Sequence, residues 1–128
     1  MCDLNFIDTS LITDMSLLFY YIKEFNGDIS NWDVSNVTNM AYMFSNSKFK
    51  GDISNWDVSN VTDMSFMFTD MSFMFDNSEF NGDISNWDVS NVTNMSGMFQ
   101  ESKFNHDISK WNVSKVIDME IMFEKSPL

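Results

Sequence analysis

Apolar and polar residues follow one another along this chain in a pattern that repeats. In the unit that begins at 25, the apolar positions are Phe25, Ile29, Trp32, Val34, Val37, Met40, Met43 and Phe44. The pattern begins again at Phe49, Phe80 and Phe104, and its tryptophans recur after 24, 31 and 24 residues. Self-similarity at such a period is typical of a solenoid, in which each unit buries its apolar side against its neighbours.

Each unit contains two spacings. Ile29, Trp32 and Val34 are spaced like the short strand of a leucine-rich repeat. From Val37 the apolar residues follow i, i+3, i+6 and i+7, which predicts a helix of about two and a half turns with Ser35 as its N-cap. A helix this short is marginal alone in water, so stacking has to stabilise it.

The pattern therefore predicts an α/β fold, a leucine-rich-repeat-like solenoid with short parallel strands on one face and short helices on the other. We expect one domain, 1–128, of about five stacked repeats. The repeats are 1–24, which is degenerate, then 25–48, 49–79, 80–103 and 104–128. Columns of Trp, Met and Phe would form the core. The twelve methionines also suggest copper binding, but their place on the apolar stripe favours core packing.

The repeat 49–79 holds seven extra residues. DMSFMFT (63–69) is followed at once by DMSFMFD (70–76), a tandem duplication. Seven residues are close to two helical turns, with only about 20° of drift, which favours an extended helix. Met71, Met74 and Phe75 would then form an exposed apolar ridge that binds a partner or drives self-association. A bulging loop is the equally open alternative.

Composition excludes several partner classes. Seven lysines, no arginine and nineteen acidic residues give a net charge of −12, which opposes binding to nucleic acid and to anionic membranes. The longest apolar run, LLFYYI (17–22), is too short for membrane insertion, and we find no signal peptide or transmembrane segment. The single cysteine excludes an internal disulfide.

The polar side chains that face outward from the predicted strands are the candidate partner-binding residues. They are Asn31, Asp33, Asn55, Asp57, Asn86 and Asp88. Carboxylates at the spacing of a sheet repel by about 1 kcal/mol in water and about 3 at an effective dielectric of 20. Backbone amides, the serine two residues later, or a cation would offset this. Each aspartate locking its own turn is the favoured interpretation, and binding a basic, glycan or calcium-bearing partner is the alternative. A second acidic column is Asp28, Asp52, Asp83 and Asp107.

Catalysis is not expected from these residues. The chain has one histidine, His106, and one cysteine, and no serine stands in a recognisable catalytic motif. Repeated carboxylates share nearly the same surroundings, whereas a catalytic acid and base need different ones. We predict no catalytic residues, no metal site and no cofactor.

The string WDVSNVTNMxxMF, preceded by FNGDIS, resembles the repeat of the BspA-like leucine-rich-repeat surface proteins, also described as a lipoprotein-associated bacterial surface-protein repeat. The resemblance covers nearly the whole chain. It implies a cell-surface or secreted adhesion protein, although this chain shows no export signal. We therefore expect a non-catalytic module that recognises a protein or a glycan. The alternatives are an architectural spacer array and a calcium-dependent binding module that uses stacked aspartates.

Overall fold

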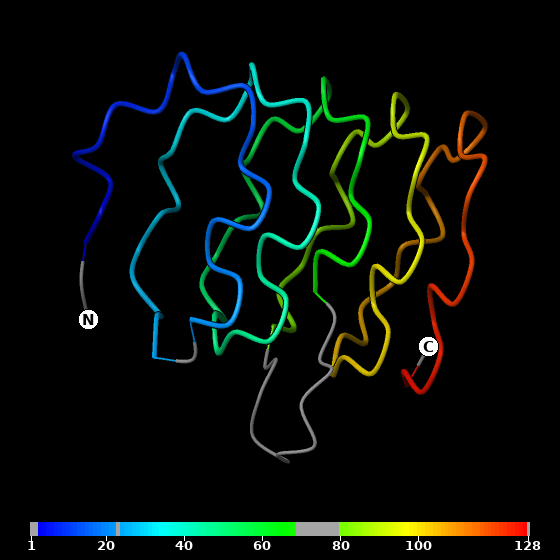
Figure 1. Cartoon of the computed structure of the whole chain (residues 1–128). Helices are drawn as coiled ribbons and strands as arrows, with labels where there is room; N and C mark the ends of the chain where they lie inside the picture. The colour runs from blue at the N-terminus through cyan, green and yellow to red at the C-terminus, as the bar shows by residue number, and fades with distance from the viewer. Residues whose placement is uncertain (1–2, 23, 69–79, 128) are drawn as a thin grey trace.

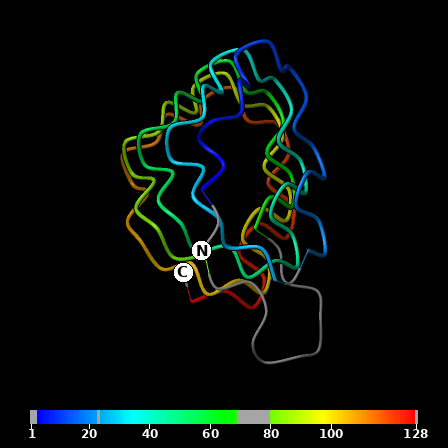
Figure 2. The same ribbon diagram turned by 90° about the vertical axis from the view of Figure 1, so that its left-hand side faces the viewer.

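The computed structural model describes residues 3–22, 24–68 and 80–127, which wind through five stacked coils. We number the coils by residue range: coil 1 is 3–22, coil 2 is 24–48, coil 3 is 49–68, coil 4 is 80–103 and coil 5 is 104–127. Figure 1 shows the coils side by side, with coil 1 and coil 5 at opposite ends. Figure 2 looks along the stack and shows the coils surrounding a common interior.

The predicted α/β architecture is wrong. The described residues contain no helix, and their only β-structure is a set of isolated parallel bridges. One bridge joins Asp3 to Asp28. The others form a single row from coil to coil, through Asp14, Asn39, Asp63, Asn94 and Asp118. The repeat is therefore a stack of turns. The described ranges also hold no helix long and apolar enough to cross a membrane.

Hydrogen bonding explains why 37–44 is not helical. In coil 2 the N–H groups of Met40, Tyr42 and Phe44 donate to carbonyls of coil 3, each at 2.9 Å. The intervening N–H groups close turns inside the coil: Met43 donates to the Met40 carbonyl and Ser45 to the Tyr42 carbonyl, both at 3.2 Å. In a helix each N–H group donates to the carbonyl four residues earlier in the same helix, so these N–H groups could not also donate to the next coil.

The turns place a left-handed backbone at two repeated positions. Tyr21, Asn46, Glu101 and Lys125 occupy the second of them. Leu17, Tyr42, Phe66, Gly97 and Ile121 occupy the first, with φ between 53° and 63°. In coil 2 this residue is the third of the turn that Met40 and Met43 close, where a positive φ is typical of type II turns. Glycine fits this conformation without steric cost, yet only coil 4 has one there.

The other half of each coil is also built from turns. In coil 2 the Trp32 N–H donates to the Ile29 carbonyl at 3.1 Å, and the Val37 N–H to the Val34 carbonyl at 2.9 Å. Each tryptophan also reaches back one coil, as the Trp56 indole N–H does to the Ile29 carbonyl at 3.1 Å. The segment predicted as a strand is thus two consecutive turns, and Ser35 lies in the second of them rather than at a helix N-cap.

The predicted core columns are confirmed in the middle coils. Met40, Met64 and Met95 are fully buried. Phenylalanine rings stack from coil to coil, with centroids 5.7 Å apart for Phe44 and Phe68 and 5.8 Å apart for Phe68 and Phe99. The spacing of apolar residues therefore identified the inward side chains, although not the backbone that carries them.

The predicted apolar ridge, Met71, Met74 and Phe75, lies outside the described residues. Coils 3 and 4, on either side of it, pair directly: the Thr93 N–H donates to the Thr62 carbonyl at 2.8 Å. Self-association through the inserted segment stays a prediction.

Candidate functional site

Two rows of aspartates run along the outside of the stack. We call Asp8, Asp33, Asp57 and Asp88 the Asp33 column, and Asp28, Asp52, Asp83 and Asp107 the Asp28 column. Each aspartate begins an Asp-x-Ser triplet at a turn. The position two residues before serine allows the carboxylate to accept the serine N–H in an Asx turn.

The Asp33 column repeats one geometry with little variation. Asp33 Oδ1 accepts the Ser35 N–H at 3.0 Å and the Ser35 hydroxyl at 2.6 Å. Asp57 and Asp88 accept the same two bonds from the serines that follow them. In all three, Oδ2 has no hydrogen bond from any described residue. Coils 2, 3 and 4 thus each hold one carboxylate oxygen fixed and leave the other without a hydrogen bond from the described residues.

These hydrogen bonds favour the ionised form of Asp33 and of Asp88. The Ser35 hydroxyl, followed by the Ser35 N–H, lowers the pKa of Asp33 below its ordinary value, and Asp8 opposes this by like-charge repulsion. The Ser90 hydroxyl and N–H lower the pKa of Asp88 in the same way. The serine and the backbone amide, two of the three offsets considered for the repulsion, are therefore present in the structure.

All six predicted partner-binding residues lie in the described part of the chain and are exposed. They lie on turns, so the interpretation as a strand face was wrong. Each asparagine precedes a buried tryptophan, as Asn31 precedes Trp32, and each aspartate follows one. The two kinds of residue therefore flank the tryptophan column on the outside of the stack.

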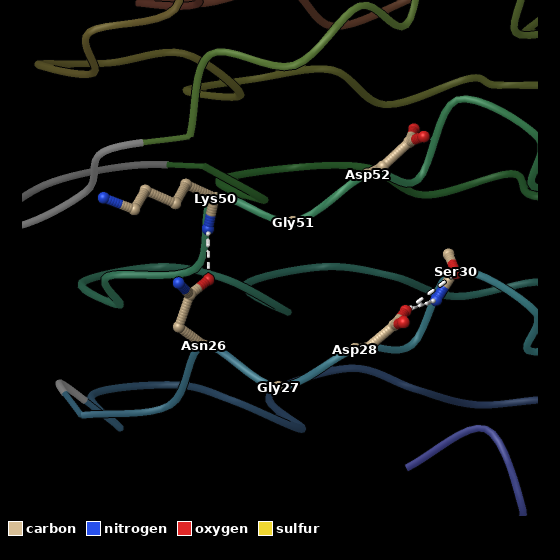
Figure 3. Close-up of a pocket in the computed structure, with 7 residues that line it drawn as sticks. All are labelled: Asn26, Gly27, Asp28, Ser30, Lys50, Gly51 and Asp52. Atoms are coloured by element: carbon tan, nitrogen blue, oxygen red, sulfur yellow. Dashed lines mark hydrogen bonds between the residues drawn. The ribbon is translucent and has the colours of Figure 1, made fainter. Parts of the chain in front are cut away.

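Figure 3 shows a hollow that sequence reasoning missed, which we call the Asp28 hollow. It has a volume of about 440 Å³, and its lining residues come from coils 2 and 3: Asn26, Gly27, Asp28, Ser30, Lys50, Gly51 and Asp52. The Lys50 N–H donates to Asn26 Oδ1 at 3.1 Å, which ties the two coils together. The Lys50 side chain extends away from both carboxylates (Figure 3).

The buried phenylalanine rings explain why glycine precedes the aspartate of this column. A Cβ added to Gly51 would lie 2.8 Å from the Phe49 ring, closer than real side chains approach. A Cβ added to Gly82 in coil 4 would lie 3.0 Å from Phe80. The packing of phenylalanine beneath the turn therefore favours glycine, and glycine leaves space beside the aspartate. The repeated Gly-Asp pair was the sequence signal for it.

The equivalent hollow between coils 4 and 5 has a different lining, because His106 stands where coils 2, 3 and 4 have glycine. Together with Asp83, Ser85, Asp107 and Lys110 it lines a smaller hollow of about 160 Å³. Ser85 is the main cause of the lowered pKa of Asp83, and His106 adds to it. A histidine and a lysine thus lie beside the carboxylates here, whereas in the Asp28 hollow the lysine side chain extends away from them (Figure 3).

The aspartate columns present repeated, nearly identical carboxylates. Within 3–22, 24–68 and 80–127, no three His, Cys, Asp or Glu side chains cluster closely enough to hold a metal ion. The aspartates of a column share the same hydrogen bonds, so none is set apart as an acid or a base. What the columns offer is fixed negative charge and open acceptor oxygens.

Comparison with known proteins identifies a family but no activity. A family model described as "Mycoplasma protein of unknown function, DUF285" matches residues 2–72 and again residues 69–127. The two matches meet at the duplicated heptads. Neither the curated proteins nor the solved structures give a match.

Proposed function

Because the chain belongs to the family described as Mycoplasma protein of unknown function, DUF285, whose description states no activity, we propose a function from geometry: a non-catalytic module that binds a lysine-rich, extended protein segment. The Asp33 column is the main contact surface in this proposal. The Asp28 hollow is a second place where a cationic side chain fits between two carboxylates.

One observation carries the proposal. In three successive coils the aspartate of the Asp33 column fixes Oδ1 within its own turn and leaves Oδ2 without a hydrogen bond from the described residues. Such a side chain loses little rotamer freedom when a partner's ammonium group arrives, because its own turn has already ordered it. The net charge of −12 adds attraction over a longer range.

The test compares two variants that lose the same charge. Asp33→Asn/Asp57→Asn/Asp88→Asn removes three charges from the Asp33 column, and Asp28→Asn/Asp52→Asn/Asp83→Asn removes three from the Asp28 column. Asparagine preserves the turn, since Asn112 already accepts the Ser114 N–H at 3.0 Å at the equivalent place in coil 5. Titration calorimetry with a lysine decapeptide gives the affinity of each variant.

We expect the Asp33-column variant to weaken binding by about tenfold or more, a loss of about 1.4 kcal/mol, and the Asp28-column variant to lose less. Equal losses would mean that net charge alone attracts the peptide. Unchanged binding in both variants would remove the two columns as sites and favour a spacer role.

A location at the cell surface belongs to the same proposal. It is supported by the resemblance of FNGDIS and WDVSNVTNMxxMF to BspA-like surface repeats. Protease treatment of intact cells that produce the protein tests it, because a surface module is degraded while cytoplasmic markers survive. Protection of the chain in intact cells, with degradation after lysis, would contradict the location.

A further inference from the structure

The two ends of the stack leave complementary backbone groups unbonded. In coils 1 to 4, alternate N–H groups donate to carbonyls of the following coil, as the Met95 N–H does to Asp118 at 2.9 Å. The equivalent donors of coil 5 have no partner among the described residues. They are the N–H groups of Met119, Ile121 and Phe123.

Coil 1 presents the matching acceptors. The carbonyls of Asp14, Ser16 and Leu18 correspond to those that accept from the preceding coil elsewhere, and within the described ranges they accept nothing. One repeated hydrogen bond has the opposite direction, from a coil to the coil before it. Inside the stack, the Thr93 N–H of coil 4 donates to the Thr62 carbonyl of coil 3 at 2.8 Å. At the ends, the equivalent donor, the Thr13 N–H, and the equivalent acceptor, the Ile117 carbonyl, have no hydrogen bond to any described residue.

Both ends also expose positions that are core elsewhere. In coil 5, Val113, Met119 and Phe123 are 36%, 43% and 40% exposed, whereas their counterparts in coil 4 are at most 1% exposed. In coil 1, Ile7 and Leu18 are 40% and 42% exposed. Apolar surface next to a row of open backbone donors or acceptors is a template for another chain.

We propose that coil 5 of one copy of this chain stacks on coil 1 of a second copy, in the register that joins neighbouring coils within the chain. The N–H groups of Met119, Ile121 and Phe123 donate to the carbonyls of Asp14, Ser16 and Leu18 of the other copy. The apolar columns then continue across the junction. The contact is heterologous, so it leaves one open end of each kind and extends into a fibre.

Charge opposes this junction, which gives it a distinctive salt dependence. Each copy carries a net charge of −12. Within the chain the bridge row alternates acid and amide, from Asp14 through Asn39, Asp63 and Asn94 to Asp118, whereas the junction sets Asp118 beside Asp14. Added salt screens this repulsion, so stacking strengthens as ionic strength rises. Binding to a lysine-rich peptide weakens under the same change.

Sedimentation velocity of the 128-residue chain from micromolar to millimolar concentration, at low and high salt, is the first measurement. We expect species heavier than a dimer that grow with concentration and with salt. A chain that stays monomeric throughout, or stops at a dimer, overturns the proposal.

Two variants then test the pairing of the ends. Met119→Lys blocks the coil 5 end and Leu18→Lys blocks the coil 1 end, so each alone loses self-association. Mixed together, they retain one good end each and form a one-to-one dimer that cannot extend. Asn55→Lys adds the same charge in the middle of the stack and serves as the control, which we expect to assemble like the parent chain.

Circular dichroism before mixing confirms that each variant is folded. Assembly by Met119→Lys alone, or a mixture of folded variants that stays monomeric, contradicts the end-to-end contact. Loss of assembly in Asn55→Lys would trace the association to charge rather than to the ends.

Discussion

Among single residues, the aspartate and serine of the Asp-x-Ser triplet close the repeated turns of the coils. One carboxylate oxygen accepts both the N–H and the hydroxyl of the serine, so the aspartate closes a turn and stays charged. The serine N–H and hydroxyl thereby offset part of the predicted repulsion along the columns. The same triplet occurs in both columns and in several bridge-row positions, such as Asp63 with Ser65.

These bonds predict acid sensitivity. The pKa values of Asp33 and Asp88 are lowered from 3.8 by their serines, so the stabilisation is complete above the unfolded-state pKa and is lost as pH falls through the folded-state value. We expect a melting temperature that is flat from neutral pH down to about 4 and falls below it. In Asp33→Asn/Asp88→Asn this fall is smaller. An identical fall in the variant and the parent chain would contradict the assignment.

The glycine beneath the Asp28 hollow gives a second prediction at this scale. Gly51→Ala places a methyl group 2.8 Å from the Phe49 ring, so a buried ring has to move, at a cost of about 1 to 3 kcal/mol of unfolding free energy. Urea denaturation followed by tryptophan fluorescence measures it. Asn55→Ala, on an exposed side chain, is the control and stays within about 0.5 kcal/mol. Equal stability of the two variants would show that the ring does not restrict this position.

At the scale of the element, turns replace the predicted strand and helix. The apolar residues predicted to point inward are buried in coil 2, from Ile29 to Phe44. Their spacing did not reveal the backbone, because successive turns place side chains inward at intervals that overlap with those of a helix. The choice depends on the next coil, which accepts alternate N–H groups. The residues of a single unit do not show that a neighbouring coil accepts these N–H groups.

The left-handed position tests this description of the element. Ile121 has φ of 53°, which costs a non-glycine residue about 1 to 2 kcal/mol, and part of this returns when glycine replaces it. Ile121→Gly and Ile121→Ala both remove the side chain, which is 42% exposed, but only glycine also removes the steric cost of the positive φ, so the glycine variant should have the higher unfolding free energy by about 0.5 to 1 kcal/mol. Thermal denaturation of the two variants in dilute solution measures the difference. A lower melting temperature for the glycine variant than for the alanine variant would contradict the left-handed turn.

At the scale of the whole molecule, the array behaves as a line of coils in which each contacts its neighbours. The repeat period, the single array and the columns of large apolar side chains followed from sequence alone. The Asp28 hollow did not, because it depends on two coils lying side by side with glycine in both. The open ends also emerged only from the direction of the inter-coil hydrogen bonds.

The duplicated heptad does not disturb the stacking of the coils on either side of it. Phe49 and Phe80 stack with ring centroids 6.2 Å apart, the same separation as Phe80 and Phe104, so coils 3 and 4 pack as an ordinary pair. Deleting 70–76 joins MFT to NSEF, which closely matches MFSNSKF at 43–49. It restores the 24-residue period and leaves every described residue of coils 3 and 4 in the chain.

We therefore expect the deletion to change the unfolding free energy by no more than about 1 kcal/mol, because shortening a connection by seven residues alters its closure entropy only slightly. Deleting 56–62 removes the same number of residues, but it takes Trp56, Val58 and Val61 from the core and should unfold the array. Circular dichroism melts of both deletions provide the comparison. A deletion of 70–76 that unfolds the chain would show that the heptad is part of the stack, and equal tolerance of the two deletions would contradict the packing of coil 3.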